Sequence, residues 1–341
     1  MFRVIILVIS LLISANAVIF EDMLKEKVSL KKEIKDIKKI YASSPILLYT
    51  LYAIDKEKIA GLNFPFNQGE SKYLDKKIVG LPVLGGWFGK GRTPNSEMIL
   101  QVNPDLILVS EFTKKMGEQK IKASLGNRDI PLVYLKSNTL EELVNSFSFI
   151  GKLTNQEERA NRLLQYGNDS LVLAKEISKK VIKKPKVYYA EGKNGLQTEC
   201  DSSLHAELIN LAGGKNVHKC QIQNQFGKQT VNFEQVLTYN PEIILVYDKE
   251  FYQKIYKDNK WKHIDAVKNK KVYLLPKGPF SWFDRPPSFM KLLGLKWLLS
   301  VFHPEIYQLD IQAEAKLFYK LFLNMELSEK QLNEIMGKEN D

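Results

Sequence analysis

The sequence has few cysteines and histidines, and it lacks the short motifs of most exported enzymes. It holds two cysteines and four histidines in 341 residues, and Cys200 and Cys220 do not have CxxC spacing. GxSxG, HExxH, phosphate-loop and GxGxxG patterns do not occur. The chain is therefore not predicted to be an enzyme, and no cofactor is expected.

Long hydrophobic runs are missing after residues 1–17. That first stretch has one positive charge, an apolar segment over 4–13 and an Ala-Asn-Ala ending, which is typical of a secretory signal cleaved after Ala17. The apolar segment is too short to span a bilayer, and no cysteine follows it to carry a lipid anchor. We expect a soluble protein exported to the periplasm.

The formal net charge is +11, but the basic residues are spread along the chain with acids between them, as in KKEIKDIKK at 31–39. Such a run usually forms a solvated face. Export argues against a nucleic-acid partner, so an anionic small ligand is the functional interpretation of the charge that we retain.

The two cysteines allow two interpretations. In an oxidising compartment Cys200 and Cys220 can form a disulfide. Together with His205 and His218 they can instead supply ligands for direct metal binding, although their spacing matches no zinc template. No metal site is assigned from the sequence, and His205 is the one residue retained as a candidate ligand.

Two segments of the chain match each other without a gap. Residues 95–111, NSEMILQVNPDLILVSE, align with residues 232–248, NFEQVLTYNPEIILVYD. Glu97 corresponds to Glu234, and both copies place Asn-Pro between a short helix and a buried apolar strand. The chain is therefore predicted to contain two versions of one α/β unit.

Strands and helices alternate around both copies, which predicts an α/β fold of two Rossmann-like βα lobes. Residues 139–183 repeat apolar positions at helical spacing, so a long rigid helix is expected to join the lobes, with a ligand cleft between them. The predicted organisation is a signal peptide at 1–17, an N-terminal lobe at 18–138, the connector at 139–183, a C-terminal lobe at 184–300 and a helical tail at 301–341.

Two loops place Trp-Phe shortly before an arginine, GGWFGKGR at 85–92 and SWFDR at 281–285. Both adjoin the ends of βα units, where ligands of α/β proteins bind. Aromatic faces can cover the organic part of a ligand, and arginine can bind its anionic oxygens. The alternative is that the tryptophans pack inside their lobes and the arginines are surface ions. The predicted ligand-binding residues are Trp87, Phe88, Arg92, Tyr189, Glu191, Trp282, Phe283, Asp284 and Arg285.

These features together resemble the periplasmic substrate-binding proteins of ABC importers for ferric siderophores, haem and vitamin B12. The resemblance is carried by the signal peptide, the duplicated NPD-type segments, the helical connector and SSLHAELINLAGGKNV at 202–217. It implies a rigid two-lobed receptor, expected as a monomer, whose partner is an ABC importer permease dimer in the inner membrane. It also implies that Glu97 and Glu234 dock on permease arginines.

The ligand favoured by the arginines is an anionic metal chelate, with an iron(III)-siderophore complex as the first choice. Haem, cobalamin, a nickel complex or an oxyanion in the same scaffold remain alternatives. Direct metal-ion binding is a further alternative.

Overall fold

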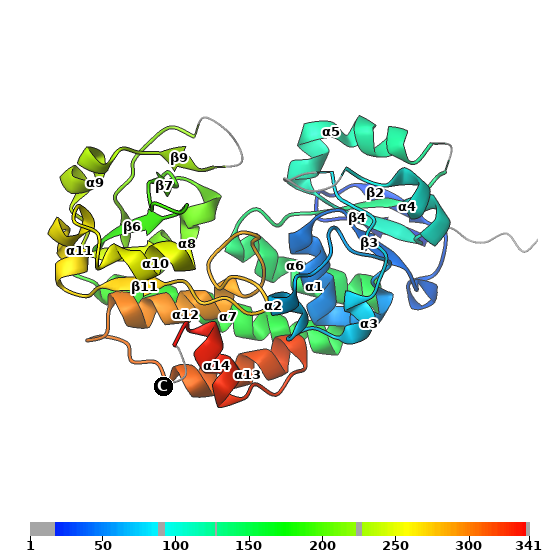
Figure 1. The fold of residues 1–341 in the computed structure, drawn as a ribbon. Coiled ribbons are helices and arrows are strands. Elements are labelled where there is room, and N and C mark those ends of the chain that lie inside the picture. The colour runs from blue at the N-terminus through cyan, green and yellow to red at the C-terminus, as the bar shows by residue number, and fades with distance from the viewer. Residues whose placement is uncertain (1–17, 88–92, 127, 223–226, 339–341) are drawn as a thin grey trace, which may run out of the picture.

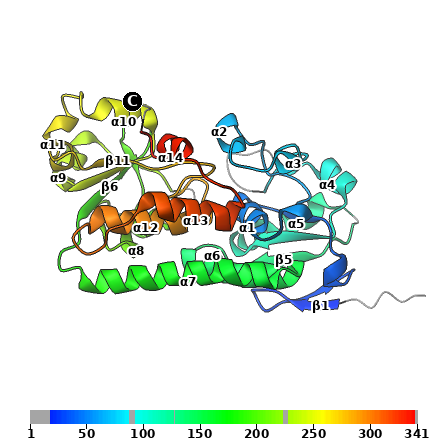
Figure 2. The same ribbon diagram turned by 90° about the horizontal axis from the view of Figure 1, so that it is seen from below.

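The computed structural model describes residues 18–87, 93–126, 128–222 and 227–338 (Figure 1). The predicted signal peptide, Phe88 and Arg92 lie outside these described residues. Two α/β lobes stand on a layer of helices, as the sequence predicts (Figures 1 and 2).

Each lobe is built on a parallel sheet. The N-terminal sheet has the order β3-β4-β5, formed by Ile40–Ala42, Leu106–Ser110 and Leu132–Leu135. The C-terminal sheet has the order β11-β10-β6-β8, formed by Val272–Leu274, Ile243–Val246, Lys186–Ala190 and Lys215–Asn216. Their strands are almost entirely buried, because helices and loops cover both faces of each sheet.

The two sheets share one register, as the duplication predicts. Leu106 of β4 pairs with Ile40, and the corresponding Ile243 of β10 pairs with Val187. In each lobe a tyrosine one residue further along is buried and donates its hydroxyl hydrogen to a glycine carbonyl, Tyr41 to Gly85 at 2.7 Å and Tyr188 to Gly195 at 2.8 Å.

The short helices before β4 and β10 also match. Helix α4 spans Ser96–Val102 and α9 spans Phe233–Tyr239, and each ends at an asparagine in the left-handed conformation, Asn103 or Asn240. A lysine ammonium caps each helix end, with Lys39 donating to the Val102 carbonyl and Lys186 to that of Tyr239. The Asn-Pro signal in the sequence therefore marks a helix end in both lobes.

The connector consists of two packed helices rather than one. Helix α6, Leu140–Thr154, begins with a Thr139–Glu142 capping box and ends at Asn155, where the backbone turns left-handed. Helix α7, Glu157–Lys180, then runs back beneath both lobes (Figure 2).

The C-terminal helices pack back against the N-terminal lobe. Helices α1 (Pro45–Asp55), α6, α7, α12 (Lys291–Phe302) and α13 (Ile311–Leu323) contribute to one continuous apolar core. Phe147 of α6 and Phe322 of α13 illustrate it, with ring centroids 5.9 Å apart. The two lobes therefore share a core beneath their sheets.

The remaining elements lie at the periphery of this framework. Two antiparallel pairs join β1 (Val18–Glu21) to β2 (Lys27–Leu30) and β7 (Gln197–Thr198) to β9 (Gln229–Thr230). The other α-helices are α2 (Gln68–Ser71), α3 (Lys76–Val79), α5 (Glu111–Ser124), α8 (Glu207–Leu211), α10 (Lys249–Ile255), α11 (Asp265–Lys268) and α14 (Glu329–Ile335). Among the described residues, no helix has the length and apolar character needed to cross a membrane.

Close packing between α12 and the loop before it predicts a strong effect for Gly294→Ala. A Cβ atom at Gly294 would lie 1.7 Å from the carbonyl oxygen of Trp282, so the backbone must shift. We expect the free energy of unfolding, measured by urea denaturation, to fall by about 3 kcal/mol or more. In the control Gly80→Ala, the nearest atom lies 3.5 Å from the added Cβ, and a change within about 1 kcal/mol is expected. Equal stability of the two variants would contradict the packing described.

Candidate ligand-binding site

The second Trp-Phe pair lies inside the protein. Trp282 is 0% exposed and Phe283 is 1% exposed. The indole Nε1 of Trp282 donates to the Tyr319 hydroxyl of α13 at 3.4 Å, and the Phe283 ring lies 4.7 Å from that of Tyr189. Rings without exposed surface cannot form the wall of a solvent-filled cleft. In this structure Trp282, Phe283 and the equally buried Tyr189 support the loop from within, which is the packing role that the sequence left open.

Of the first Trp-Phe pair, only Trp87 lies among the described residues. Trp87 is half-buried, packs on the core of the N-terminal lobe and has its ring centroid 5.6 Å from that of Tyr41. Phe88 and Arg92 fall outside the described residues. The two tryptophans therefore belong to different cores and do not meet across a shared space.

Arg285 and Glu191 do come together, at the carboxyl end of β6. The guanidinium Nε of Arg285 donates to Glu191 Oε1 at 2.6 Å, and its Nη2 pairs with Glu199. Both carboxylates are 0% exposed, whereas the Arg285 side chain is 19% exposed. Lys228 adds a second cation, with Nζ 3.5 Å from the same Glu191 oxygen. Arg285 also has a positive φ of 60°, which these contacts help to hold.

Burial and charge act against each other in this group. Burial raises the pKa of Glu191 above its ordinary value, although the charges of Arg285 and Lys228 act to lower it. Burial also acts to lower the pKa of Arg285, but the charges of Glu191 and Asp284 outweigh it and raise that pKa. Arg285 is therefore a permanent cation held by buried carboxylates.

Asp284 holds a partly exposed histidine. This carboxylate is 1% exposed, and its Oδ2 lies 2.6 Å from Nδ1 of His205, whose side chain is 25% exposed. Burial acts to lower the pKa of His205, but the hydrogen bond and charge of Asp284 outweigh it and raise that pKa. His205 is therefore bonded to a carboxylate instead of standing beside the cysteines.

A surface that the sequence did not reveal lies around Tyr247, directly after β10. The ammonium groups of Lys228 and Lys277 lie 6.0 and 5.9 Å from the centre of the Tyr247 ring. The Tyr247 hydroxyl donates to the Arg285 carbonyl at 3.1 Å. We call the group formed by Tyr247, Lys228, Lys277, Arg285 and His205 the Tyr247 surface. A residue directly after a buried parallel strand is a standard ligand position, and that signal could have identified Tyr247.

Buried polar atoms without partners gather at the carboxyl ends of the first strand of each sheet. Within the described part of the chain, the side-chain oxygens of Ser43 and Ser44 after β3 and Oε2 of Glu191 after β6 make no hydrogen bond. The same holds for one oxygen each of Asn63 and Asp284. Such atoms are rare in folded proteins and commonly face a water, an ion or a ligand.

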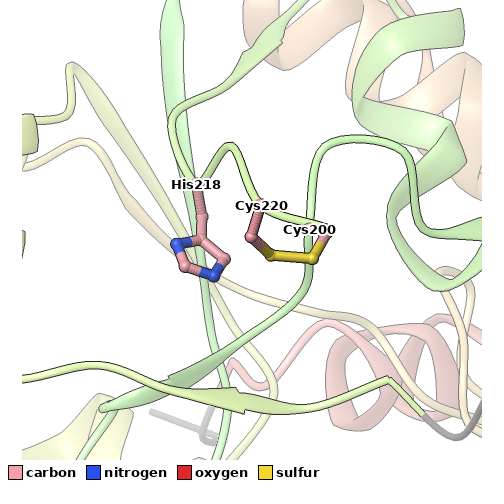
Figure 3. Close-up of side chains that lie close together, drawn as sticks. All are labelled: Cys200, His218 and Cys220. Atoms are coloured by element: carbon pink, nitrogen blue, oxygen red, sulfur yellow. A yellow bond between two sulfur atoms is a disulfide. The ribbon is translucent and has the colours of Figure 1, made fainter. Parts of the chain in front are cut away.

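The structure contains the Cys200–Cys220 disulfide, which Figure 3 shows beside His218. A disulfide offers no thiolate to a metal. Among the described residues, only Cys200, His218 and Cys220 form a cluster of three candidate metal ligands, and His205 does not belong to it. The four-residue metal set considered from the sequence is therefore not assembled in this form of the protein.

A hollow of about 440 Å³ lies elsewhere, against β1 and α6. Its lining includes Phe20, Asn145 and Phe149, and none of the predicted site residues. It therefore contributes nothing to the site at the strand ends.

Glu97 and Glu234 occupy equivalent places. Each is the second residue of its helix, α4 or α9, and both side chains are exposed. The helices that carry these two acids, α4 and α9, lie on different lobes (Figure 1).

Removal of Arg285 is predicted to destabilise the fold. Arg285→Ala leaves Glu191 and Glu199 buried without their main cation, which costs about 3 to 5 kcal/mol in unfolding free energy at neutral pH. The pKa of Glu191 is raised in the folded protein. The stability that this group contributes to the folded protein is therefore fully present below the pKa that Glu191 has in the unfolded chain. It is lost as the pH rises through the pKa that Glu191 has in the folded protein. The loss in the variant should therefore be smaller near about pH 5 than near about pH 8.

Urea unfolding at both pH values measures this effect. Arg162→Ala is the control, because Arg162 is exposed and its nearest acid, Glu158, lies 3.9 Å away. Its loss should stay within about 1 kcal/mol. A stability loss in Arg285→Ala that is small, or that grows as the pH falls, would contradict the buried ion-pair description.

Comparison with known proteins identifies the family. The sequence model of the periplasmic binding protein family matches residues 86–279. An ABC transporter solute-binding protein from Sulfurospirillum deleyianum is 37% identical, with a TM-score of 0.85 over 94% of this chain and 99% of the other.

Two characterised relatives are more distant. The molybdate-binding protein MolA of Haemophilus influenzae is 26% identical over 67% of this chain and 69% of its own. The high-affinity haem uptake protein IsdE of Staphylococcus aureus is 28% identical over 71% of this chain and 80% of its own. The names of these two relatives give different ligands. This chain belongs to the periplasmic binding protein family, the solute-binding components of ABC transporters.

Proposed function

We propose that this protein captures an anionic metal complex, of the iron(III)-siderophore kind, between its two lobes and delivers it to an ABC importer. The observation that carries the proposal is the Tyr247 surface. There the cations Arg285, Lys228 and Lys277 lie beside an aromatic ring with part of their surface exposed, while the carboxylates of Glu191 and Glu199 that pair with Arg285 and Lys228 are buried.

This separation of charge suits an anion. Lys277 is exposed and the Lys228 side chain is 38% exposed, so both ammonium groups can meet a ligand from solvent. Glu191 and Glu199 are fully buried beneath them and cannot repel it at contact distance. Ferric complexes of catecholate or citrate-like chelators carry negative charge and organic surface, which match lysines around a tyrosine.

The N-terminal lobe supplies the opposite side in this proposal. Of the residues predicted for this side, Trp87 packs against Tyr41 of β3, and Phe88 and Arg92 follow it in the sequence, outside the described residues. The aromatic and cationic side chains of this stretch would cover the second face of the complex. No bond is made or broken, because capture requires only complementary charge and shape.

Delivery rests on the shared core. Since α7 and α13 hold the lobes in a fixed relation, Glu97 and Glu234 would present a constant two-point contact to the arginines of a permease dimer. Export with cleavage after Ala17 and action as a monomer in the periplasm complete the proposal.

An oxyanion is the second candidate, and one observation favours it. The N-terminus of α1 follows Ser43 and Ser44, whose buried hydroxyl oxygens have no partner among the described residues. A helix N-terminus with free hydroxyls attracts an anion such as molybdate. The relative MolA is named for molybdate.

Haem is a further candidate. Histidine and tyrosine are common axial ligands of haem; Tyr189 is fully buried, whereas His205 is 25% exposed and is bonded through Nδ1 to Asp284, which leaves its Nε2 for an axial bond. The relative IsdE is named for haem, so haem belongs in any binding panel.

The double variant Lys228→Gln/Lys277→Gln tests the ligand class. Loss of two charged contacts should weaken binding of a ferric tricatecholate about 10- to 100-fold, as measured by tryptophan fluorescence or calorimetry. Lys257→Gln/Lys271→Gln is the control, because both lysines are exposed and lie outside the Tyr247 surface. Unchanged ferric-complex affinity in the first variant would overturn the role of this surface, and tight molybdate binding without ferric-complex binding would favour the second candidate.

The double variant Glu97→Gln/Glu234→Gln tests delivery. Ligand affinity should stay within about twofold of wild type, because both side chains are exposed on helices outside the Tyr247 surface, while import in cells or proteoliposomes should fall at least about tenfold. Glu176→Gln/Glu305→Gln, at two other exposed acids, should transport normally. Normal import by the first variant would rule out docking through this pair.

A further inference from the structure

We propose that reduction of the Cys200–Cys220 disulfide converts this cluster into a binding site for a thiophilic divalent cation such as Zn²⁺. The ligands would be the two cysteine thiolates and Nε2 of His218, with a water in the fourth position. This site is separate from the Tyr247 surface and does not depend on the proposed ligand.

The three side chains already lie together. One ligand atom from each of Cys200, His218 and Cys220 falls within 4.8 Å of the others. The His218 ring stands beside the disulfide in Figure 3. Two sulfurs and one imidazole nitrogen form the donor set that zinc prefers over calcium or magnesium.

His218 is oriented for this role. Its Nδ1 lies 2.9 Å from the Tyr239 hydroxyl, and the side chain is 6% exposed. Within the described residues its Nε2 is buried and has no hydrogen-bond partner. A bond at one ring nitrogen commonly orients a metal-binding histidine and leaves the other nitrogen for the metal.

The backbone keeps the cluster together without the disulfide. The Asp201 amide donates to the His218 carbonyl at 2.8 Å, and the Asn216 side-chain amide donates to the Glu199 carbonyl at 3.0 Å. These two bonds join the segment around Cys200 to the segment around His218. The cysteine Cα atoms are 5.2 Å apart, so breaking the sulfur–sulfur bond leaves both thiols facing the same small volume.

The conversion is chemically balanced with a thiol or phosphine reductant. The disulfide accepts two electrons and two protons and gives two thiols, and the reductant becomes a disulfide or a phosphine oxide. Binding of the cation then releases both thiol protons to solvent. Thiolates about 2.3 Å from tetrahedral zinc lie roughly 3.8 Å apart, a spacing within reach of two cysteines whose Cα atoms are 5.2 Å apart.

Metal binding would preserve the cross-link that reduction removes. Cys200 follows Glu199, whose carboxylate holds Arg285 and the Lys228 amide. A sulfur–metal–sulfur bridge would keep residues 218–220 attached beside this carboxylate. The metal-loaded form should therefore retain the geometry of the charged group.

Cobalt titration tests the proposal. Wild-type protein is reduced with a phosphine, desalted anaerobically and titrated with Co²⁺, whose thiolate charge-transfer absorption reports sulfur ligation. We expect one equivalent of Co²⁺ with this absorption in the reduced protein, none in the oxidised protein, and loss of the signal on adding Zn²⁺.

Two variants identify the ligands. His218→Gln keeps the disulfide for folding and should bind Co²⁺ at least about tenfold more weakly after reduction. Cys220→Ser, with folding checked by circular dichroism, should lose most of the charge-transfer intensity. His263→Gln, at an exposed histidine elsewhere, should bind like wild type. Absence of thiolate absorption in reduced wild type, or equal binding by His218→Gln, would overturn the proposal.

Discussion

The structure depends on the apolar core that the two lobes share. Helices α1, α6, α7, α12 and α13 bury aromatic and aliphatic side chains in one continuous cluster beneath both sheets. Tyr49 of α1 stacks on Phe280 of the loop before α12 at a centroid distance of 3.6 Å, which joins the lobes directly. Close packing of this kind resists shear, so the lobes cannot separate without exposing the core. We therefore expect this protein to bind its ligand with little domain movement.

The same core explains where the charged site lies. Trp282 is buried beneath the loop that carries Asp284 and Arg285, and this packing fixes the loop against β6. Three buried carboxylates then hold two partly exposed side chains, the Arg285 cation and the His205 ring. A buried carboxylate paired with a partly exposed cation creates a directed local field. In the proposed function, Arg285 would therefore present positive charge to a ligand although it is paired.

Much of the fold was readable from the sequence, because it depends on local patterns. Apolar strands such as 106–110 and 243–246, and the repeated Asn-Pro helix ends, specify the two lobes through residues close together in the chain. Whether the Trp282 side chain points into the core or into a cleft could not be predicted in this way. It packs in the core beside Tyr319 of α13, a residue far along the chain from it. The Tyr247 surface was missed for a similar reason, since Lys228 and Lys277 come from separate loops that only the folded chain brings together.

The proposed function places the ligand at the carboxyl ends of both sheets, between the N-terminal lobe and the Tyr247 surface. A crystal structure of the protein with a ferric catecholate complex, with iron located by its anomalous scattering, tests this placement most directly. The account predicts one iron peak between the lobes with the chelator oxygens facing Lys228 and Lys277. An iron peak at any other surface, or full occupancy of the complex without contact to either lysine, would contradict it.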